Sequence, residues 1–124
     1  MTRVLVADDD PVQLELRRLL LEAAGHEVSL AQSPADAVRC LNERGADVAV
    51  IDLRFPNADG ESDPREGLTL IRRIRHLGGK TRLIVVSGWP DDIEGQPEET
   101  MVDRVLIKPF KPSELGQVIH ELTA

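Results

Sequence analysis

The sequence predicts an α/β fold in which helices alternate with the strands of a parallel sheet. Two observations indicate this class. Apolar runs of strand length alternate with segments whose apolar residues recur at helical spacing. Glycine or proline marks most of the boundaries between them. Because 124 residues are enough for one hydrophobic core, we expect one domain over 1–124.

The chain is expected to begin with a strand over 3–7 and a helix over 11–24. Asp10 precedes Pro11, which is the usual arrangement of a capping residue and the first helical position. Gly25 is expected to end the helix in the left-handed conformation. The helical spacing predicts an inward face made of Val12, Leu16, Leu19, Leu20 and Ala23.

A second strand–helix unit follows, with a strand over 26–31 and a helix that begins at Pro34. Ser33 is its expected cap, and Gly45 closes it. Its expected inward residues are Ala37, Val38 and Leu41. The next run, 47–51, is nearly all apolar, which favours a strand buried at the centre of the sheet.

The second half continues the alternation with less regular connections. The stretch 55–66 contains two prolines and a glycine and is expected to be a long loop. A helix over 68–77 should direct Leu70, Ile71, Ile74 and Leu77 inward. Two strands are expected over 82–86 and 104–107, separated by a segment, 88–100, too rich in proline and glycine for a regular helix. The last helix starts near Pro112, with Leu115, Val118, Ile119 and Leu122 inward.

Composition disfavours several classes of function. The net charge of −7 and the absence of a dense basic block argue against nucleic-acid binding by this domain. The single cysteine, Cys40, cannot form an intrachain disulfide and fits a small core residue. No signal peptide or membrane-length apolar run is present, so we expect a cytoplasmic protein without membrane contact.

Polar residues at the strand ends predict the chemistry. Asp8 and Asp9 follow the first strand, Asp52 the third, Ser87 the fourth and Lys108 the fifth. The carboxyl ends of parallel strands share one edge of a sheet, where such folds build their ligand sites. Carboxylates suit Mg²⁺, and one of them can accept a phosphoryl group whose charge an ammonium group neutralises. The set therefore points to phosphoryl transfer with Mg²⁺ as cofactor.

The same residues resemble the receiver domain of two-component response regulators. The matching stretches, in the family's order, are Asp8-Asp9, Asp52-Leu53-Arg54-Phe55-Pro56, Val86-Ser87-Gly88 and Lys108-Pro109-Phe110. The resemblance spans the whole chain. It implies a doubly wound, flavodoxin-like fold with five parallel strands in the order 2-1-3-4-5 and helices on both faces.

The resemblance also implies roles for the strand-end residues. Asp52 would be the phosphoacceptor, Ser87 the switch hydroxyl and Lys108 the lysine that contacts the phosphoryl group. Mg²⁺ would be bound by Asp9 and Asp52, by Asp8 through water, and by the backbone carbonyl of Arg54. The peptide bond between Lys108 and Pro109 would be cis.

The implied function is that of a signalling module rather than an enzyme. A histidine kinase or a histidine phosphotransfer protein would donate the phosphoryl group, and the modified surface would change the binding of an unidentified downstream protein. We expect a monomer or weak dimer. The chain stops soon after its last helix, so we expect a stand-alone receiver or an excised domain, and Met1 so close to the first strand favours a natural start.

Three departures from the family pattern stand out. Val105 occupies the position of the usual switch aromatic. It is either simply a suitable edge-strand residue or a sign that the output is not read through the usual face. The loop before the third helix is long, and Glu66-Gly67 fits the family's glycine pair better than Asp59-Gly60 does. Arg54 and Trp89 are both large at positions that flank the phosphoryl group. This bulk predicts slow autodephosphorylation, although Trp89 is also a candidate anchor for a partner.

Two alternatives stay open from the sequence. One is a receiver-like binding module that acts independently of phosphorylation. The other is a phosphatase similar to haloacid dehalogenases, for which Asp8, Asp10, Ser87, Lys108 and Asp91-Asp92 would supply the chemistry. That alternative leaves Asp52 without a role, and the chain is short for that family's core.

Overall fold

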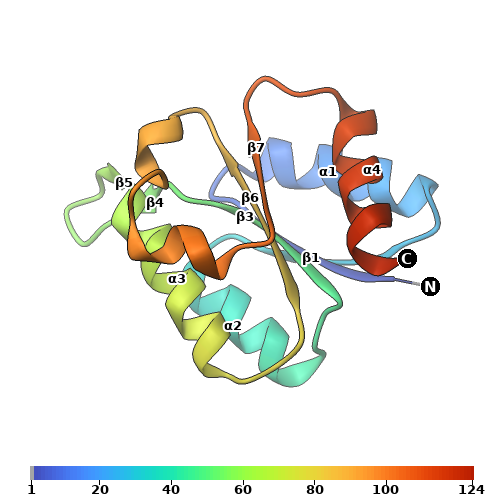
Figure 1. Ribbon diagram of the computed structural model, residues 1–124, viewed down its shortest axis with the longest axis horizontal. Coiled ribbons are helices and arrows are strands. Elements are labelled where there is room, and N and C mark those ends of the chain that lie inside the picture. The colour runs from blue at the N-terminus through green and yellow to red at the C-terminus, as the bar shows by residue number, and fades with distance from the viewer. Residues whose placement is uncertain (1) are drawn as a thin grey trace.

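The computed structural model describes residues 2–124 and is built around one parallel sheet (Figure 1). Its strands are β1 (Arg3–Ala7), β2 (Glu27–Ala31), β3 (Val48–Asp52), β6 (Arg82–Ser87) and β7 (Arg104–Ile107). They pair in the order β2-β1-β3-β6-β7, and every pairing is parallel. The expected order 2-1-3-4-5 and the doubly wound fold are therefore confirmed.

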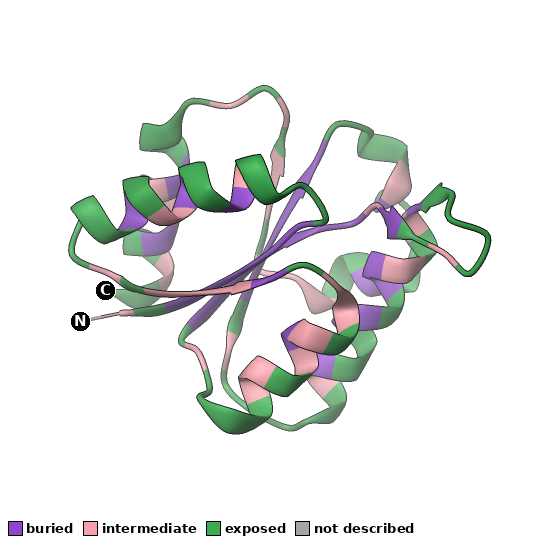
Figure 2. Cartoon of the chain, turned by 180° about the vertical axis from the view of Figure 1, so that it is seen from behind, coloured by how far each residue is buried: buried purple, intermediate pink, exposed green. Residues whose placement is uncertain are grey.

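Four helices cover the sheet, two on each face (Figure 1). They are α1 (Pro11–Ala23), α2 (Pro34–Glu43), α3 (Pro64–His76) and α4 (Pro112–Thr123). Two separate clusters of buried residues show the division, because one joins the sheet to α2 and α3 and the other joins it to α1 and α4. Figure 2 shows the buried strands between helices whose outer faces are exposed.

Successive side chains of a strand point to opposite faces of the sheet, so each strand contributes residues to both core clusters. On β1, Leu5 and Ala7 belong to the α2–α3 side, whereas Val4 and Val6 belong to the α1–α4 side. All five residues of β3 are buried, as expected for the centre of a parallel sheet. The carboxyl ends of β1, β3, β6 and β7 consequently share one edge of the sheet.

The helix starts agree with local capping rules. The side chains of Asp10, Ser33 and Asp63 each accept a hydrogen bond from a backbone N–H in the first turn of their helix. A proline occupies the first position of all four helices. Gly25 has φ of 92°, which confirms its expected left-handed conformation after α1.

The expected inward face of α1 was wrong. Val12, Leu16, Leu19, Leu20 and Ala23 are exposed. The buried residues are Leu14, Arg17 and Leu21. Both sets have helical spacing, so periodicity alone could not choose between them. The rotation that occurs buries a guanidinium group, because Arg17 is drawn inward to the Asp8 carboxylate.

The connection from β3 to α3 is more ordered than expected. Two-residue strands β4 (Phe55–Pro56) and β5 (Ser62–Asp63) pair antiparallel within the predicted loop. The helix begins at Pro64 rather than residue 68, because Asp63 caps it and proline is favoured at its first position. Leu77, predicted to face inward, lies just beyond the helix and is exposed.

Several other expectations for the helices and loops hold. The segment 88–100 forms only the short 3-10 helices η1 (Pro90–Asp92) and η2 (Pro97–Met101). Cys40 is half-buried and packs against the α2–α3 cluster. The inward residues predicted for α2 and α4 are buried or packed against the core. Within residues 2–124, no helix has the length and apolar character needed to cross a bilayer.

Two helical glycines give a stability test of the contact between α3 and the end of β3. A Cβ atom on Gly67 would lie 2.4 Å from Leu53 Cα and Leu53 O, whereas one on Gly116 in α4 would meet no atom within 4 Å. Gly67→Ala should lower the free energy of unfolding by about 2 kcal/mol or more, because the backbone of α3 or of Leu53 must move to make room for the added methyl group. Gly116→Ala should raise it by about 0.5–1 kcal/mol. Urea denaturation of both variants measures the difference, and equal effects would contradict the close packing.

Candidate functional site

The structure brings Asp52 and Lys108 into direct contact. Asp52 is the last residue of β3, and Lys108 follows β7, two strands away in the sheet. Lys108 Nζ lies 2.6 Å from Asp52 Oδ2 although the residues are 56 positions apart in the chain. Asp52 is 8% exposed, so this ion pair lies in a recess at the sheet edge rather than on the open surface.

The other oxygen of Asp52 is held by its own loop. The backbone N–H of Arg54 donates to Asp52 Oδ1 at 3.1 Å. The loop itself is fixed by α3, because the N–H of Gly67 donates to the carbonyl of Leu53 at 2.9 Å. The Asp52 carboxylate therefore has a defined orientation, with one oxygen toward Lys108.

The three acidic residues after β1 have three different environments. Asp8 is 2% exposed, and its Oδ1 accepts the Asp10 N–H at 3.0 Å. Asp10 is exposed, and its Oδ1 accepts the Val12 N–H at 2.9 Å, which confirms its role as a cap. Asp9 is exposed, and within residues 2–124 no hydrogen bond or ion pair engages its carboxylate. Asp9 is thus the member best placed to take an external cation.

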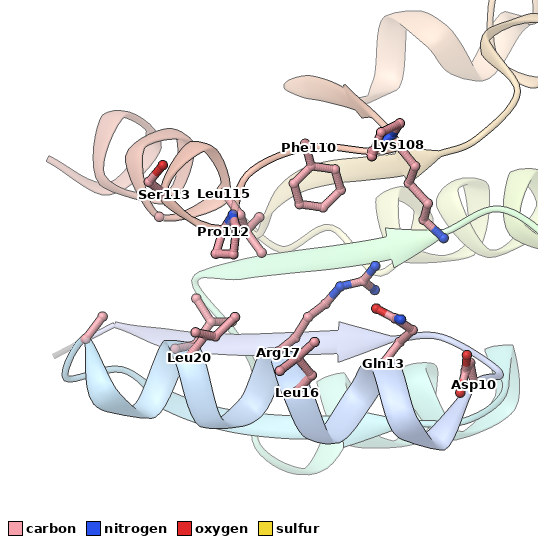
Figure 3. A pocket seen from close by; sticks show the side chains of 14 residues that line it. Asp10, Gln13, Leu16, Arg17, Leu20, Lys108, Phe110, Pro112, Ser113 and Leu115 are labelled. Atoms are coloured by element: carbon pink, nitrogen blue, oxygen red, sulfur yellow. The ribbon is translucent and has the colours of Figure 1, made fainter.

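Arg17 is a site residue that the sequence analysis missed. Its Nη1 lies 2.9 Å from Asp8 Oδ2, and both side chains are almost completely buried. Figure 3 shows Arg17 rising from α1 toward the sheet, while Lys108 approaches the same region from the opposite side. Leu14 and Leu21 share its face at helical spacing, but the opposite face of α1 has an equally good pattern, so no local signal identified Arg17.

Ser87 ends β6 and is buried, with its hydroxyl engaged by the following loop. Its Oγ accepts the Trp89 N–H and donates to the Trp89 carbonyl, both at 3.0 Å.

The peptide bond between Lys108 and Pro109 is cis, as the family resemblance implied. Val105 lies on the edge strand β7 and packs against the α2–α3 cluster, which accounts for its apolar side chain.

Arg54 and Trp89 form a stacked pair beside Asp52, and Asp92 from η1 completes it. The Arg54 guanidinium carbon lies 3.7 Å from the centroid of the Trp89 ring. Arg54 Nε and Nη2 donate to the two carboxylate oxygens of Asp92 at 2.8 and 3.2 Å. These hydrogen bonds raise the pKa of Arg54 against the opposing effect of burial, and the nearby charges of Asp52 and Asp63 contribute less. We call Arg54, Trp89 and Asp92 the clasp.

The donor set at the sheet edge fits a magnesium ion that keeps several waters. Within the described residues, no three His, Cys, Asp or Glu side chains form a cluster that could hold a metal by itself. Mg²⁺ does not need one, because it is commonly bound by one or two carboxylates together with water and phosphoryl oxygens. Asp9 and Asp52 supply hard oxygen ligands at the ends of adjacent strands β1 and β3.

A groove of about 700 Å³ lies between α1 and α4. Arg17 and Lys108 border it, and Leu16, Leu20 and Phe110 give it an apolar wall (Figure 3). Two of the α1 leucines that were expected in the core, Leu16 and Leu20, therefore line a groove that Asp10 also borders.

Comparison with known proteins agrees with this geometry. The model of the response regulator receiver domain family matches residues 4–120. The chain is 32% identical over 118 residues to the virulence transcriptional regulatory protein PhoP of Salmonella typhimurium, covering 93% of this chain and 49% of that protein. It is 34% identical over 119 residues to the transcriptional regulatory protein AruR of Pseudomonas aeruginosa, covering 91% and 46%. The chain thus spans about half the length of these curated relatives.

Solved structures give the same result for the fold. A CheY-like receiver domain from Methylobacillus flagellatus superposes with a TM-score of 0.84 at 26% identity, covering 98% of each chain. The response regulator TrrA from Thermotoga maritima, solved in complex with Mg²⁺ and BeF, superposes with a TM-score of 0.84 at 23% identity, covering 98% of this chain and 99% of that one.

The distinct environments of the acidic residues can be tested by single substitutions. Asp10→Ala should lower the free energy of unfolding by about 1 kcal/mol, because the first turn of α1 loses its cap. Asp9→Ala should leave stability in EDTA unchanged or slightly higher, because it removes only a repelling charge. Urea denaturation without metal makes this comparison. If Asp9→Ala were as destabilising as Asp10→Ala, the exposed and unpaired state of Asp9 would be wrong.

Proposed function

The chain belongs to the response regulator receiver domain family of two-component systems, and on this premise we propose that it accepts a phosphoryl group on Asp52. The single observation that carries the proposal is the contact between Asp52 Oδ2 and Lys108 Nζ at 2.6 Å. It joins a nucleophilic carboxylate to a cation at a sheet edge where Asp9 is available for a metal.

The residues act in the following way in this proposal. One Asp52 oxygen attacks the phosphorus of a phosphohistidine on a histidine kinase or a phosphotransfer protein. The P–N bond breaks, its electron pair stays on the imidazole, and an acyl phosphate forms. Lys108 is already beside the acceptor and moves from the carboxylate to a phosphoryl oxygen, so charge is neutralised without a large rearrangement.

Mg²⁺, when bound, would neutralise phosphoryl oxygens, and Asp9, Asp52 and the Arg54 carbonyl would hold it, with Asp8 acting through water. The TrrA complex with Mg²⁺ and BeF supports this assignment by likeness of fold. Ser87 would leave the Trp89 carbonyl and donate to the phosphoryl group. Because both hydroxyl contacts of Ser87 go to Trp89, this movement would reach the loop before η1 and alter binding of a downstream protein.

The test is intact mass after incubation with acetyl phosphate and Mg²⁺. We expect one phosphoryl adduct on the wild-type chain, none on Asp52→Asn, and none when EDTA is present. Asp91→Asn is a matched control, because Asp91 is an exposed carboxylate outside the site, and it should form the adduct normally.

Two results would contradict the proposal in different ways. An adduct that persists in Asp52→Asn would place the acceptor elsewhere, and phosphatase turnover surviving that substitution would favour the dehalogenase-like alternative. No adduct with either acetyl phosphate or purified phosphohistidine donors, together with partner binding unchanged by Asp52→Asn, would favour the phosphate-independent binding module.

We also propose that the clasp slows hydrolysis of the acyl phosphate. Arg54 and Trp89 stack beside Asp52, and Asp92 fixes the guanidinium, so water has less room for in-line attack. The double variant Arg54→Ala/Trp89→Ala should lose its phosphoryl group at least about tenfold faster, equivalent to about 1.4 kcal/mol of barrier. The decay of the phosphorylated mass after removal of acetyl phosphate gives the rate.

Arg65→Ala is the control for the loss of a positive charge near the site. Arg65 pairs with Asp63 and has a largely exposed side chain, so its removal should not change the decay rate. If the double variant hydrolyses at the wild-type rate or more slowly, the clasp does not shield the phosphoryl group.

A further inference from the structure

Arg17 is unusual among the basic side chains of this protein. It is 7% exposed, and it is the one lysine or arginine among the buried residues of 2–124. The next residue, Arg18, has the usual arrangement of a basic side chain, because it forms ion pairs with Glu15 and Glu22 on the outer surface of α1. The difference between these two neighbours requires an explanation that is specific to position 17.

Stability does not provide that explanation. Desolvating a guanidinium and a carboxylate costs several kcal/mol, and a buried ion pair is often no more stable than apolar residues of similar size. Arg17 lies between Leu14 and Leu21 on a face that packs against the sheet, where an apolar side chain would be the simple solution. The partner it pairs with, Asp8, belongs to the candidate site.

The pairing gives Asp8 a partner within the protein at each carboxylate oxygen. Its Oδ2 accepts Arg17 Nη1 at 2.9 Å, and its Oδ1 accepts the Asp10 N–H at 3.0 Å. Both oxygens are therefore engaged within the protein. The charge of Asp8 is compensated by a group tethered to α1, which solvent salt screens only weakly because the pair is buried.

The charges around the site show what this compensation does. Asp8, Asp9 and Asp52 with Lys108 sum to −2, and Arg17 reduces this to −1. Arg17 therefore opposes binding of a divalent cation at Asp9 and Asp52, while it holds the Asp8 carboxylate in a fixed orientation. We propose that Arg17 is a tethered counter-cation of the acidic site, a positioning residue that holds Asp8 and sets a low Mg²⁺ affinity.

The inference rests on the proposed metal-dependent function, and a Mg²⁺ titration separates the two. Trp89 is the only tryptophan of the chain and contacts both Ser87 and Arg54, so its fluorescence is a local reporter. Titration with MgCl₂ at about pH 8, where carboxylates are ionised, gives the affinity. The rise in unfolding temperature with MgCl₂ gives a second, independent value.

Arg17→Met keeps an apolar stem and removes the charge, and it should bind Mg²⁺ at least about fivefold more tightly than the wild type. A merely structural role for Arg17 would predict weaker binding or none. Arg18→Met is the matched control, with the same change of charge one residue away on the exposed side, and its affinity should equal that of the wild type.

Arg17→Met leaves Asp8 buried without its partner and could unfold. The pair Asp8→Asn and Asp8→Asn/Arg17→Met gives a second comparison, because the double variant buries no unpaired charge. Thermal unfolding without metal first establishes that Asp8→Asn, in which Arg17 lacks its partner, is folded. Asp8→Asn should bind Mg²⁺ more weakly than the wild type, and adding Arg17→Met should restore at least about fivefold of affinity.

The outcomes are distinct. Tighter binding on removal of Arg17 in either background, with Arg18→Met unchanged, supports the inference. Equal affinities of Asp8→Asn and Asp8→Asn/Arg17→Met would overturn it while leaving the proposed function standing. If the wild-type chain shows no Mg²⁺ binding by either measurement at any concentration, the metal-dependent function itself fails.

Discussion

Lys108 reaches the Asp52 carboxylate at 2.6 Å because β3, β6 and β7 run parallel and are paired so that their carboxyl ends share one edge. This pairing is possible because β3 is buried on both faces, with α1 and α4 covering one side and α2 and α3 the other. The two core clusters hold the register, since a shift of one residue would exchange the side chains between the two faces. The position of every candidate site residue follows from that register.

Compensation of charge is the common feature of the site. Asp52 is paired with Lys108, Asp8 with Arg17, and Asp92 with Arg54. Each pair joins different elements of the fold, so the acidic edge is held together by cations from β7, α1 and the loop after β3. Within residues 2–124, neither Asp9 nor Asp10 has an ion-pair partner, and because Asp10 accepts the Val12 N–H as a helix cap, Asp9 is the carboxylate with neither kind of partner. The arrangement leaves the Asp9 carboxylate free to take an external cation, whereas the paired carboxylates are held in place by their cations.

The irregular segments of the fold contact the candidate site. Ser87 is tied to Trp89, Trp89 is stacked by Arg54, and Arg54 is tied to Asp92 in η1. A change at Asp52 therefore has a contiguous path of contacts to η1. Val105 contributes packing on the α2–α3 side instead of an aromatic ring. The loop before η1 contacts the site through Ser87, and the end of β7 contacts it through Lys108, whose backbone N–H donates to the Ser87 carbonyl at 2.8 Å.

The amino-acid sequence by itself determined the alternation of strands and helices, the caps at Asp10 and Ser33, and the candidate residues at the strand ends, and the resemblance to receiver domains supplied the strand order. These features depend on local hydrogen bonds, on strand-length apolar runs and on a motif with fixed order. The tertiary structure decided the inward face of α1, because Leu14–Arg17–Leu21 and the exposed leucines have equivalent helical spacing, and the packing of Leu14 and Leu21 against the sheet together with the Arg17–Asp8 pair distinguishes them. It also decided the Arg54–Asp92 pair, which joins residues 38 positions apart, and the β4–β5 pairing of two residues each. Such contacts depend on where the rest of the chain lies, which no local pattern encodes.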